Sequence, residues 1–61
     1  MKLKKIRQAA NMTQTVLANK IGVTQASVAM WETGEAKPTA DKLIKLSEVL
    51  GCTVDELLRK D

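Results

Sequence analysis

Residues 25–33 combine amide, hydroxyl and small apolar side chains at a spacing that favours recognition over catalysis. If Val28 and Trp31 face the interior of a helix, the outward positions hold no charge; they are Ala26, Ala29, Met30 and Thr33, flanked by Gln25 and Ser27. Glutamine can form two hydrogen bonds with the edge of adenine, and alanine, threonine or methionine can contact a thymine methyl group. The segment therefore predicts a helix that enters the major groove of DNA. The same face would suit a protein partner, and the residues alone leave both alternatives open.

Residue types that are scarce or missing exclude several function classes. The 61 residues contain no histidine and one cysteine, Cys52, so a Cys/His zinc site, a Ser-His-Asp triad and a Cys-His pair are excluded. We also find no carboxylate pair, thiol–base pair or phosphate loop placed for catalysis. We expect neither an enzyme nor a metal or cofactor, and we interpret Cys52 as a small apolar or neutral surface residue.

The charge of the chain is unevenly distributed along the sequence. The net charge is +3, from 10 basic and 7 acidic residues. Residues 1–31 contain five of the bases and no acid, whereas residues 32–61 contain the other five bases and all seven acids. A basic half of this kind indicates a polyanionic partner such as nucleic acid.

Five short helices must position these side chains, and no segment alternates as a strand would. Apolar spacing predicts an all-α domain over residues 1–61, with helices at about 2–10, 14–21, 25–32, 40–50 and 54–60. The expected helix N-caps are threonines, namely Thr13, Thr24, Thr39 and Thr53, the last in a capping box with Glu56. Gly22 and Gly51 are expected to end helices, and Gly34 and Pro38 to bracket a loop. No apolar run reaches 18 residues and no leader is evident, which predicts a cytoplasmic protein.

The second and third helices are joined only by Gly22-Val23-Thr24. So short a turn prevents antiparallel packing, and the two helices must cross steeply. A steep crossing needs a small residue at the contact, and Ala18 is placed there. This arrangement predicts a helix-turn-helix, although a generic helical hairpin would share some of its features.

At this point the sequence resembles the lambda-repressor/Cro-type helix-turn-helix domain, or XRE family, over roughly residues 3–58. The matching residues are Leu3-Lys4-Lys5-Ile6-Arg7, Met12-Thr13-Gln14, Leu17-Ala18, Ile21-Gly22-Val23-Thr24, Ser27-Val28, Trp31-Glu32-Thr33-Gly34, Pro38, Leu43-Ile44-Lys45-Leu46, Leu50 and Asp55-Glu56-Leu57-Leu58. The resemblance implies a five-helix bundle that binds inverted-repeat operator DNA as a homodimer. It also implies a transcriptional regulator, expected to be a repressor, from a bacterium, phage or mobile element, whose activity a protein partner could control.

The resemblance also implies roles for individual residues. Three residues would read bases: Gln25, Ala26 and Met30. Six would lie along the DNA backbone: Arg7, Gln14, Thr24, Ser27, Thr33 and Lys37. Gln14 would contact a phosphate and could brace Gln25. Two positions depart from the family pattern, because many relatives have Asn where this chain has Thr33 and Lys or Arg where it has Glu35. One strong polar reader implies that DNA shape and dimer symmetry add to specificity.

Two further expectations concern stability and assembly. Arg7 and Glu32 each lie beside apolar positions, where a lone charge is unfavourable, and the family pairs these positions; we expect a structural ion pair. Val49, Leu57 and Leu58, with part of Ile44, exceed the need of one small core and predict the dimer interface. Trp31 falls on the apolar stripe and is expected in the core.

Overall fold

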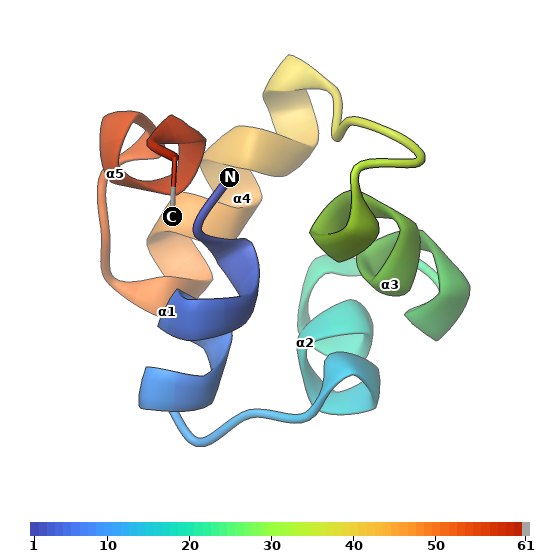
Figure 1. The fold of residues 1–61 in the computed structure, drawn as a ribbon. Helices are drawn as coiled ribbons and strands as arrows, with labels where there is room; N and C mark the ends of the chain where they lie inside the picture. The colour runs from blue at the N-terminus through green and yellow to red at the C-terminus, as the bar shows by residue number, and fades with distance from the viewer. Residues whose placement is uncertain (61) are drawn as a thin grey trace.

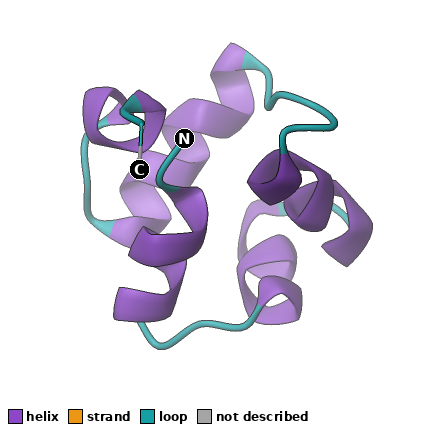
Figure 2. Cartoon of the chain, viewed as in Figure 1, coloured by secondary structure: helices purple, strands orange, loops and turns teal. Residues whose placement is uncertain are grey.

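The computed structural model describes residues 1–60, and five α-helices account for the fold in this range (Figure 1). They are α1 (Leu3–Ala9), α2 (Gln14–Ile21), α3 (Gln25–Thr33), α4 (Ala40–Leu50) and α5 (Val54–Leu58). Helices alternate with loops and no strand occurs among these residues (Figure 2), which confirms the predicted all-α class. None of the helices in residues 1–60 has the length and apolar character needed to cross a membrane.

The helices pack around one centre. The α2 helix packs against α3 and α4, α5 packs against α4, and α1 contacts α3. The backbone N–H of Lys2 donates to the carbonyl of Leu57 at 2.9 Å, which holds the start of the chain beside α5. In Figure 1, α2 and α3 lie together on one side of the molecule, so the predicted helix-turn-helix forms a distinct outer surface.

Threonine hydroxyls begin three of the helices as the sequence predicts. Thr13, Thr24 and Thr53 each accept a hydrogen bond from the backbone N–H three residues later, at 3.0–3.1 Å. Thr39 occupies the N-cap position of α4 in an extended conformation, as predicted, but its side chain makes no capping hydrogen bond. The capping box is also incomplete. Its Glu56 carboxylate was expected to accept from the backbone N–H of Thr53, but it accepts from the Thr53 hydroxyl at 3.2 Å.

The bounds of α2 and α4 agree with the predicted helices, and the other three differ at their ends. The α1 helix is shorter because Asn11 adopts a left-handed conformation with φ of 58°, which turns the chain toward α2. The α3 helix extends to Thr33. The α5 helix ends at Leu58, since Arg59 has an extended backbone.

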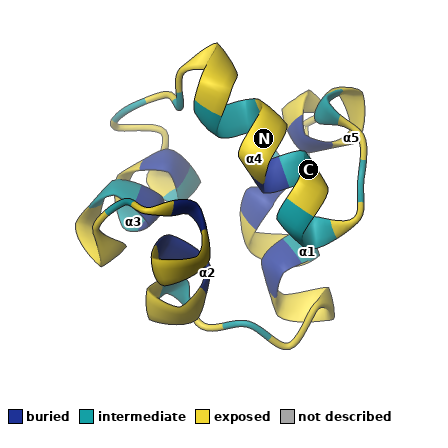
Figure 3. Ribbon diagram, turned by 180° about the vertical axis from the view of Figure 1, so that it is seen from behind, coloured by how far each residue is buried: buried dark blue, intermediate teal, exposed yellow. Residues whose placement is uncertain are grey.

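The core draws side chains from all five helices (Figure 3). Its buried apolar residues are Leu3, Leu17, Ala18, Ile21, Val28, Trp31, Leu46 and Leu57. Trp31 is 8% exposed, so its predicted place in the core is confirmed. This core is aliphatic around one indole, and it fixes the inward side of α3 and therefore the direction of the outward side.

Leu57 requires a correction. It was expected in a dimer interface, but its side chain is completely buried in the core of the single chain. The α5 helix has only five residues and packs on α4, and its two adjacent leucines differ in direction by about 100° around the helix axis. Leu57 faces the core, and Leu58 remains 55% exposed.

Candidate nucleic-acid interface

The turn between α2 and α3 has the close geometry that the sequence predicts. Gly22 ends α2 with φ of 76°, a left-handed conformation that side chains with a Cβ rarely adopt. The N–H of Val23 then donates to the carbonyl of Ala18 at 3.0 Å. Ala18 is itself 2% exposed, and so small a side chain lets α3 cross close to α2. The outward side of α3 is thereby held at a fixed angle.

The outward side of α3 is exposed and carries no charged side chain. Gln25, Ala26, Met30 and Thr33 are exposed, with Met30 at 38%, whereas Ser27 and Ala29 are half-buried. Val28 is fully buried on the opposite side. Glu32 turns away from this surface toward α1. The helix therefore presents one amide, two hydroxyls and several apolar groups to whatever it meets.

A chain of hydrogen bonds connects this surface to the core. Gln25 Nε2 donates to Gln14 Oε1 at 2.6 Å, and Gln14 Nε2 donates to Glu32 Oε1 at 3.0 Å. Arg7 Nε lies 2.6 Å from Glu32 Oε2 and Arg7 Nη2 lies 3.2 Å from Glu32 Oε1. Arg7 Nη1 donates to the carbonyl of Met12 at 2.8 Å. The predicted pair of Arg7 and Glu32 is thus present as a two-point ion pair, with side chains only 9% and 4% exposed.

At the inner end of this series of hydrogen bonds, the charges of Arg7 and Glu32 stabilise each other. Burial alone would raise the pKa of Glu32, but hydrogen bonds from Arg7 and Gln14, and the charges of Arg7 and Lys4, lower that pKa overall. The hydrogen bond to Glu32 raises the pKa of Arg7 although burial opposes this. Glu32 therefore stays ionised and can only accept hydrogen bonds.

An ionised Glu32 determines how both glutamine amides are oriented. Because the carboxylate can only accept, the amide nitrogen of Gln14 must face Glu32, and its oxygen faces Gln25. The amide nitrogen of Gln25 must then face Gln14. Gln25 Oε1 and the second hydrogen on its Nε2 have no partner within residues 1–60, so both remain available to an outside molecule.

The hydroxyls expected beside the DNA backbone lie around this surface. Thr24 and Ser27 share a hydrogen bond at 3.0 Å at the start of α3. The Thr33 hydroxyl donates to the carbonyl of Met30 at 3.2 Å, at the end of the helix. The two ends of α3 thus carry the hydroxyls, with the apolar side chains between them.

Comparison with known proteins identifies the family. A sequence model described as Helix-turn-helix matches residues 3–57. The chain belongs to the helix-turn-helix family, in its lambda-repressor/Cro (XRE) type.

Several helix-turn-helix proteins of known kind are similar to it. The cryptic phage CTXphi transcriptional repressor RstR of Vibrio cholerae is 39% identical over 51 residues, which are 84% of this chain and 46% of that protein. Repressor protein C2 of Salmonella phage P22 is 39% identical over 57 residues, which are 93% of this chain and 24% of that protein. The crystal structure of the P22 c2 repressor in complex with synthetic operator 9T superposes with a TM-score of 0.90 and 30% identity, over 98% of this chain and 91% of that one. This helix-turn-helix chain spans less than half the length of these curated relatives.

Of the residues that were expected to line the DNA backbone, Arg7 lies away from the helix-turn-helix surface and Lys37 lies in the loop after α3. Arg7 is buried, and each of its three side-chain nitrogens already donates within the chain, so its assignment to a phosphate contact was wrong. Lys37 is exposed, but its side chain lines a hollow beside Trp31. It can still reach toward solvent from there.

The bond between Gln14 and Glu32 was missed from the sequence. Gln25 and Glu32 are seven residues apart on α3, which places them on one edge of the helix, two turns apart. A residue at the start of α2 that reaches one of them can therefore reach both. That spacing was available in the sequence, but whether Gln14 reaches this edge of α3 depends on how the two helices cross.

The predicted dimer residues of this helix-turn-helix chain divide into two groups. Leu57 is in the core and Val49 is half-buried against it. Ile44 and Leu58 are 53% and 55% exposed. These two are the large apolar side chains of α4 and α5 that the fold leaves exposed.

Proposed function

We propose that the chain binds double-stranded DNA sequence-specifically as a homodimer, with α3 in the major groove, and that it represses transcription. The observation that supports this most strongly is the oriented Gln25 amide on an uncharged, exposed helix surface. The relatives named above are transcriptional repressors, and one similar structure is that of a repressor on an operator. The chain itself supplies the reading surface that such a function needs.

Gln25 is the proposed reader of adenine. Its free Oε1 would accept from adenine N6 and its second Nε2 hydrogen would donate to adenine N7. Guanine offers acceptors at both N7 and O6, so it would leave Oε1 facing another oxygen. The amide orientation that Glu32 imposes through Gln14 therefore favours adenine, and it does so before any DNA is bound.

Ala26 and Met30 are the proposed apolar readers. Both are exposed on the same side of α3 as Gln25, and neither can form a strong hydrogen bond. Their available contact is with a methyl group, and thymine is the base that presents one in the major groove. The preferred half-site should therefore combine adenine with neighbouring thymines.

The surrounding polar groups are proposed to contact phosphates. Gln14 is the first residue of α2, where the helix dipole favours an anion, and its amide nitrogen has a second hydrogen besides the one donated to Glu32. Thr24, Ser27 and Thr33 lie at the ends of α3, and Lys37 follows in the next loop. Such contacts fix the register of the helix on DNA without selecting a sequence.

Dimerisation is proposed through Ile44, Leu58 and the edge of Val49. A two-fold contact over these side chains would cover the largest exposed apolar residues of α4 and α5. Two α3 helices would then lie about 34 Å apart, one turn of DNA, and require an inverted repeat. Two half-sites also compensate for a reading surface with a single bidentate residue.

Selection of bound duplexes from a random pool, repeated at two salt concentrations, tests the proposal. We expect an inverted repeat to emerge, and affinity to fall with salt at a log–log slope of about −0.9 for each phosphate contact. Gln25→Ala should lose the enriched sequence, whereas Gln8→Ala, an exposed glutamine on α1, serves as the matched control. No enrichment and no salt dependence would reject DNA binding and favour a protein partner for the α3 surface.

A further inference from the structure

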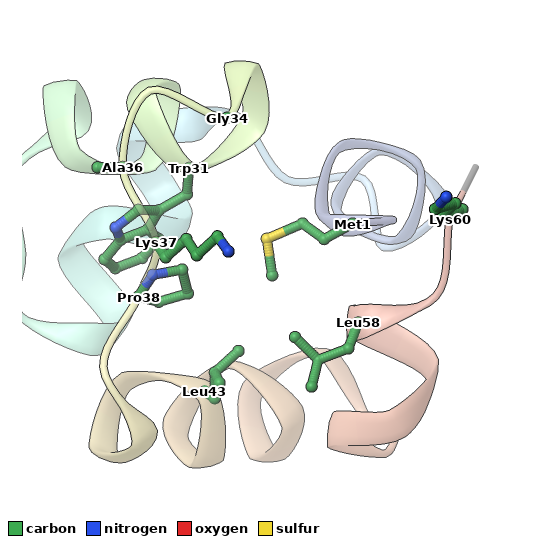
Figure 4. A pocket seen from close by; sticks show the side chains of 9 residues that line it. All are labelled: Met1, Trp31, Gly34, Ala36, Lys37, Pro38, Leu43, Leu58 and Lys60. Carbon is green, nitrogen blue, oxygen red and sulfur yellow. The ribbon is translucent and has the colours of Figure 1, made fainter.

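A hollow of about 390 Å³ lies on the side of α3 that bears Trp31, opposite the proposed reading surface (Figure 4). The α3–α4 loop, the first residue of the chain, α4 and α5 enclose it. Its apolar wall consists of Met1, Trp31, Pro38, Leu43 and Leu58. Leu58 is 55% exposed at the edge, so the hollow opens to solvent.

The only charged side chains among its lining residues are two lysines, Lys37 and Lys60. Figure 4 shows Lys37 on one side of the hollow, with its ammonium directed toward Met1, and Lys60 on the other side, beyond Met1. Neither lysine forms an ion pair within residues 1–60. An apolar wall with cations at two edges is complementary to an apolar group flanked by anions.

We propose that this hollow docks a short acidic segment of another protein, anchored by one large apolar side chain. The anchor would lie against Trp31, Leu43 and Leu58, and flanking carboxylates would lie beside Lys37 and Lys60. The volume is near the lower end of about 300–1,000 Å³ that small binding pockets span, which suits one large side chain. Such a segment satisfies both the apolar wall and the unpaired charges.

Two other occupants, a second copy of this chain and a DNA backbone, fit the hollow less well. A second copy of this chain, centred on the hollow itself and not on the dimer surface proposed above, would bring the lysines of both copies together, and like charges across an interface are unfavourable. A DNA backbone would satisfy the lysines but has no apolar group for Trp31 and Leu43. Charge and shape together therefore favour the acidic segment.

Occupation of the hollow would oppose DNA binding. This consequence rests on the proposed function, in which Lys37 contacts a phosphate and Leu58 contacts the second copy. A docked acidic segment would occupy both side chains at once. The hollow is thus a place where a partner protein releases the chain from its operator.

Direct binding tests the docking site without DNA. The probe is a capped ten-residue peptide with one phenylalanine flanked by glutamates, and Trp31 fluorescence reports its binding because Trp31 lines the hollow. Replacing the phenylalanine by serine should weaken binding about tenfold or more, as expected for loss of one buried aromatic side chain. The Lys60→Glu variant should bind the acidic peptide about fivefold more weakly than the parent at low ionic strength. It should bind a lysine-flanked peptide more tightly than the parent does.

Lys45→Glu is the matched control, since Lys45 is exposed on α4 and does not line the hollow. Equal effects of Lys45→Glu and Lys60→Glu, or no binding while the chain self-associates through this surface, would overturn the proposal. A second assay adds the peptide to the chain on its selected operator, and we expect release. If the peptide binds but the chain stays on the operator, the proposed role of the hollow in releasing the chain from DNA would be overturned. A chain that binds no duplex would reject the proposed function, while the peptide assay would still decide the docking site.

Discussion

Arg7→Met should strongly destabilise the fold, although Arg7 lies far from the reading surface. The substitution would leave Glu32, whose side chain is 4% exposed, with the Gln14 amide as its remaining hydrogen-bond partner. It would also remove the donor to the Met12 carbonyl. Removing one partner of a buried ion pair costs about 3–5 kcal/mol. At about 0.05–0.15 kcal/mol per residue, the free energy of unfolding of a domain of this size is about 3–9 kcal/mol.

The double variant Arg7→Met, Glu32→Leu should recover much of that loss, because it removes the unpaired charge and places apolar side chains against apolar neighbours. The half-buried Gln14 amide can then bond to water. We expect a coupling energy of about 2 kcal/mol or more between the two substitutions. Arg59→Met is the matched control, since its bond to Asp55 joins side chains that are 66% and 79% exposed. Losing so exposed a pair should cost about 0.5 kcal/mol or less.

Urea unfolding followed by helical circular dichroism and by Trp31 fluorescence measures all four free energies of the cycle. An osmolyte such as trimethylamine N-oxide stabilises the single variants if they are largely unfolded in buffer. Additive losses in the cycle, or an Arg7→Met variant no less stable than Arg59→Met, would refute the reasoning about the pair.

Three other perturbations test separate parts of the account. The pKa of Glu32 is lowered in the folded chain, so its stabilisation is complete above the unfolded pKa of about 4.3 and is lost as pH falls through the folded value. The urea midpoint of the parent should therefore fall on acidification more than that of the Arg7→Met, Glu32→Leu variant, and parallel pH profiles would contradict this. Gly22→Ala should cost about 1–2 kcal/mol in the same urea unfolding assay, because no atom lies within 4 Å of the added Cβ and the cost comes from the left-handed backbone alone. Gly22→Asn should cost less, and equal costs would contradict this explanation. Leu58→Glu should fold, since Leu58 is 55% exposed, but bind an inverted repeat less tightly while a single half-site is bound as before; undiminished binding of the repeat would exclude the proposed dimer surface.

Local rules made the helices and much of the site predictable from the sequence. Threonine caps and the left-handed glycine Gly22 depend on a few neighbouring residues, so α2 and the start of α3 could be placed directly. The ion pair was predictable because a lone charge beside apolar residues is unfavourable and because the family resemblance pairs the positions of Arg7 and Glu32.

Other features depend on how the helices meet, which apolar spacing does not specify. Leu57 and Leu58 are adjacent and equally apolar, and only the packing of α5 on α4 decides which of them is buried. Lys37 lies in a loop whose path over Trp31 forms the hollow, and no periodicity describes a loop. The bond from Gln14 to Glu32 joins two helices, so the sequence indicates it only after their crossing is known.

The bond between Gln25 and Gln14 changes what a substitution of Gln14 should do. The resemblance implies a phosphate contact for Gln14, and a phosphate contact affects affinity without selecting a sequence. Because its oxygen holds the Gln25 amide, Gln14→Ala should also loosen the reader and reduce discrimination at the Gln25 base pair. The loss should be smaller than for Gln25→Ala, which removes the reader itself.

Competition binding of the parent and Gln25→Ala, against a panel of single-base changes in the selected operator, tests the central claim most directly. The account predicts that the parent discriminates at an adenine in each half-site, and that Gln25→Ala loses about 1–3 kcal/mol of discrimination there and at most at one adjacent pair. Other positions should keep their ranking. If Gln25→Ala weakens every duplex by the same factor, or changes none, α3 does not read bases through Gln25 and the account is wrong.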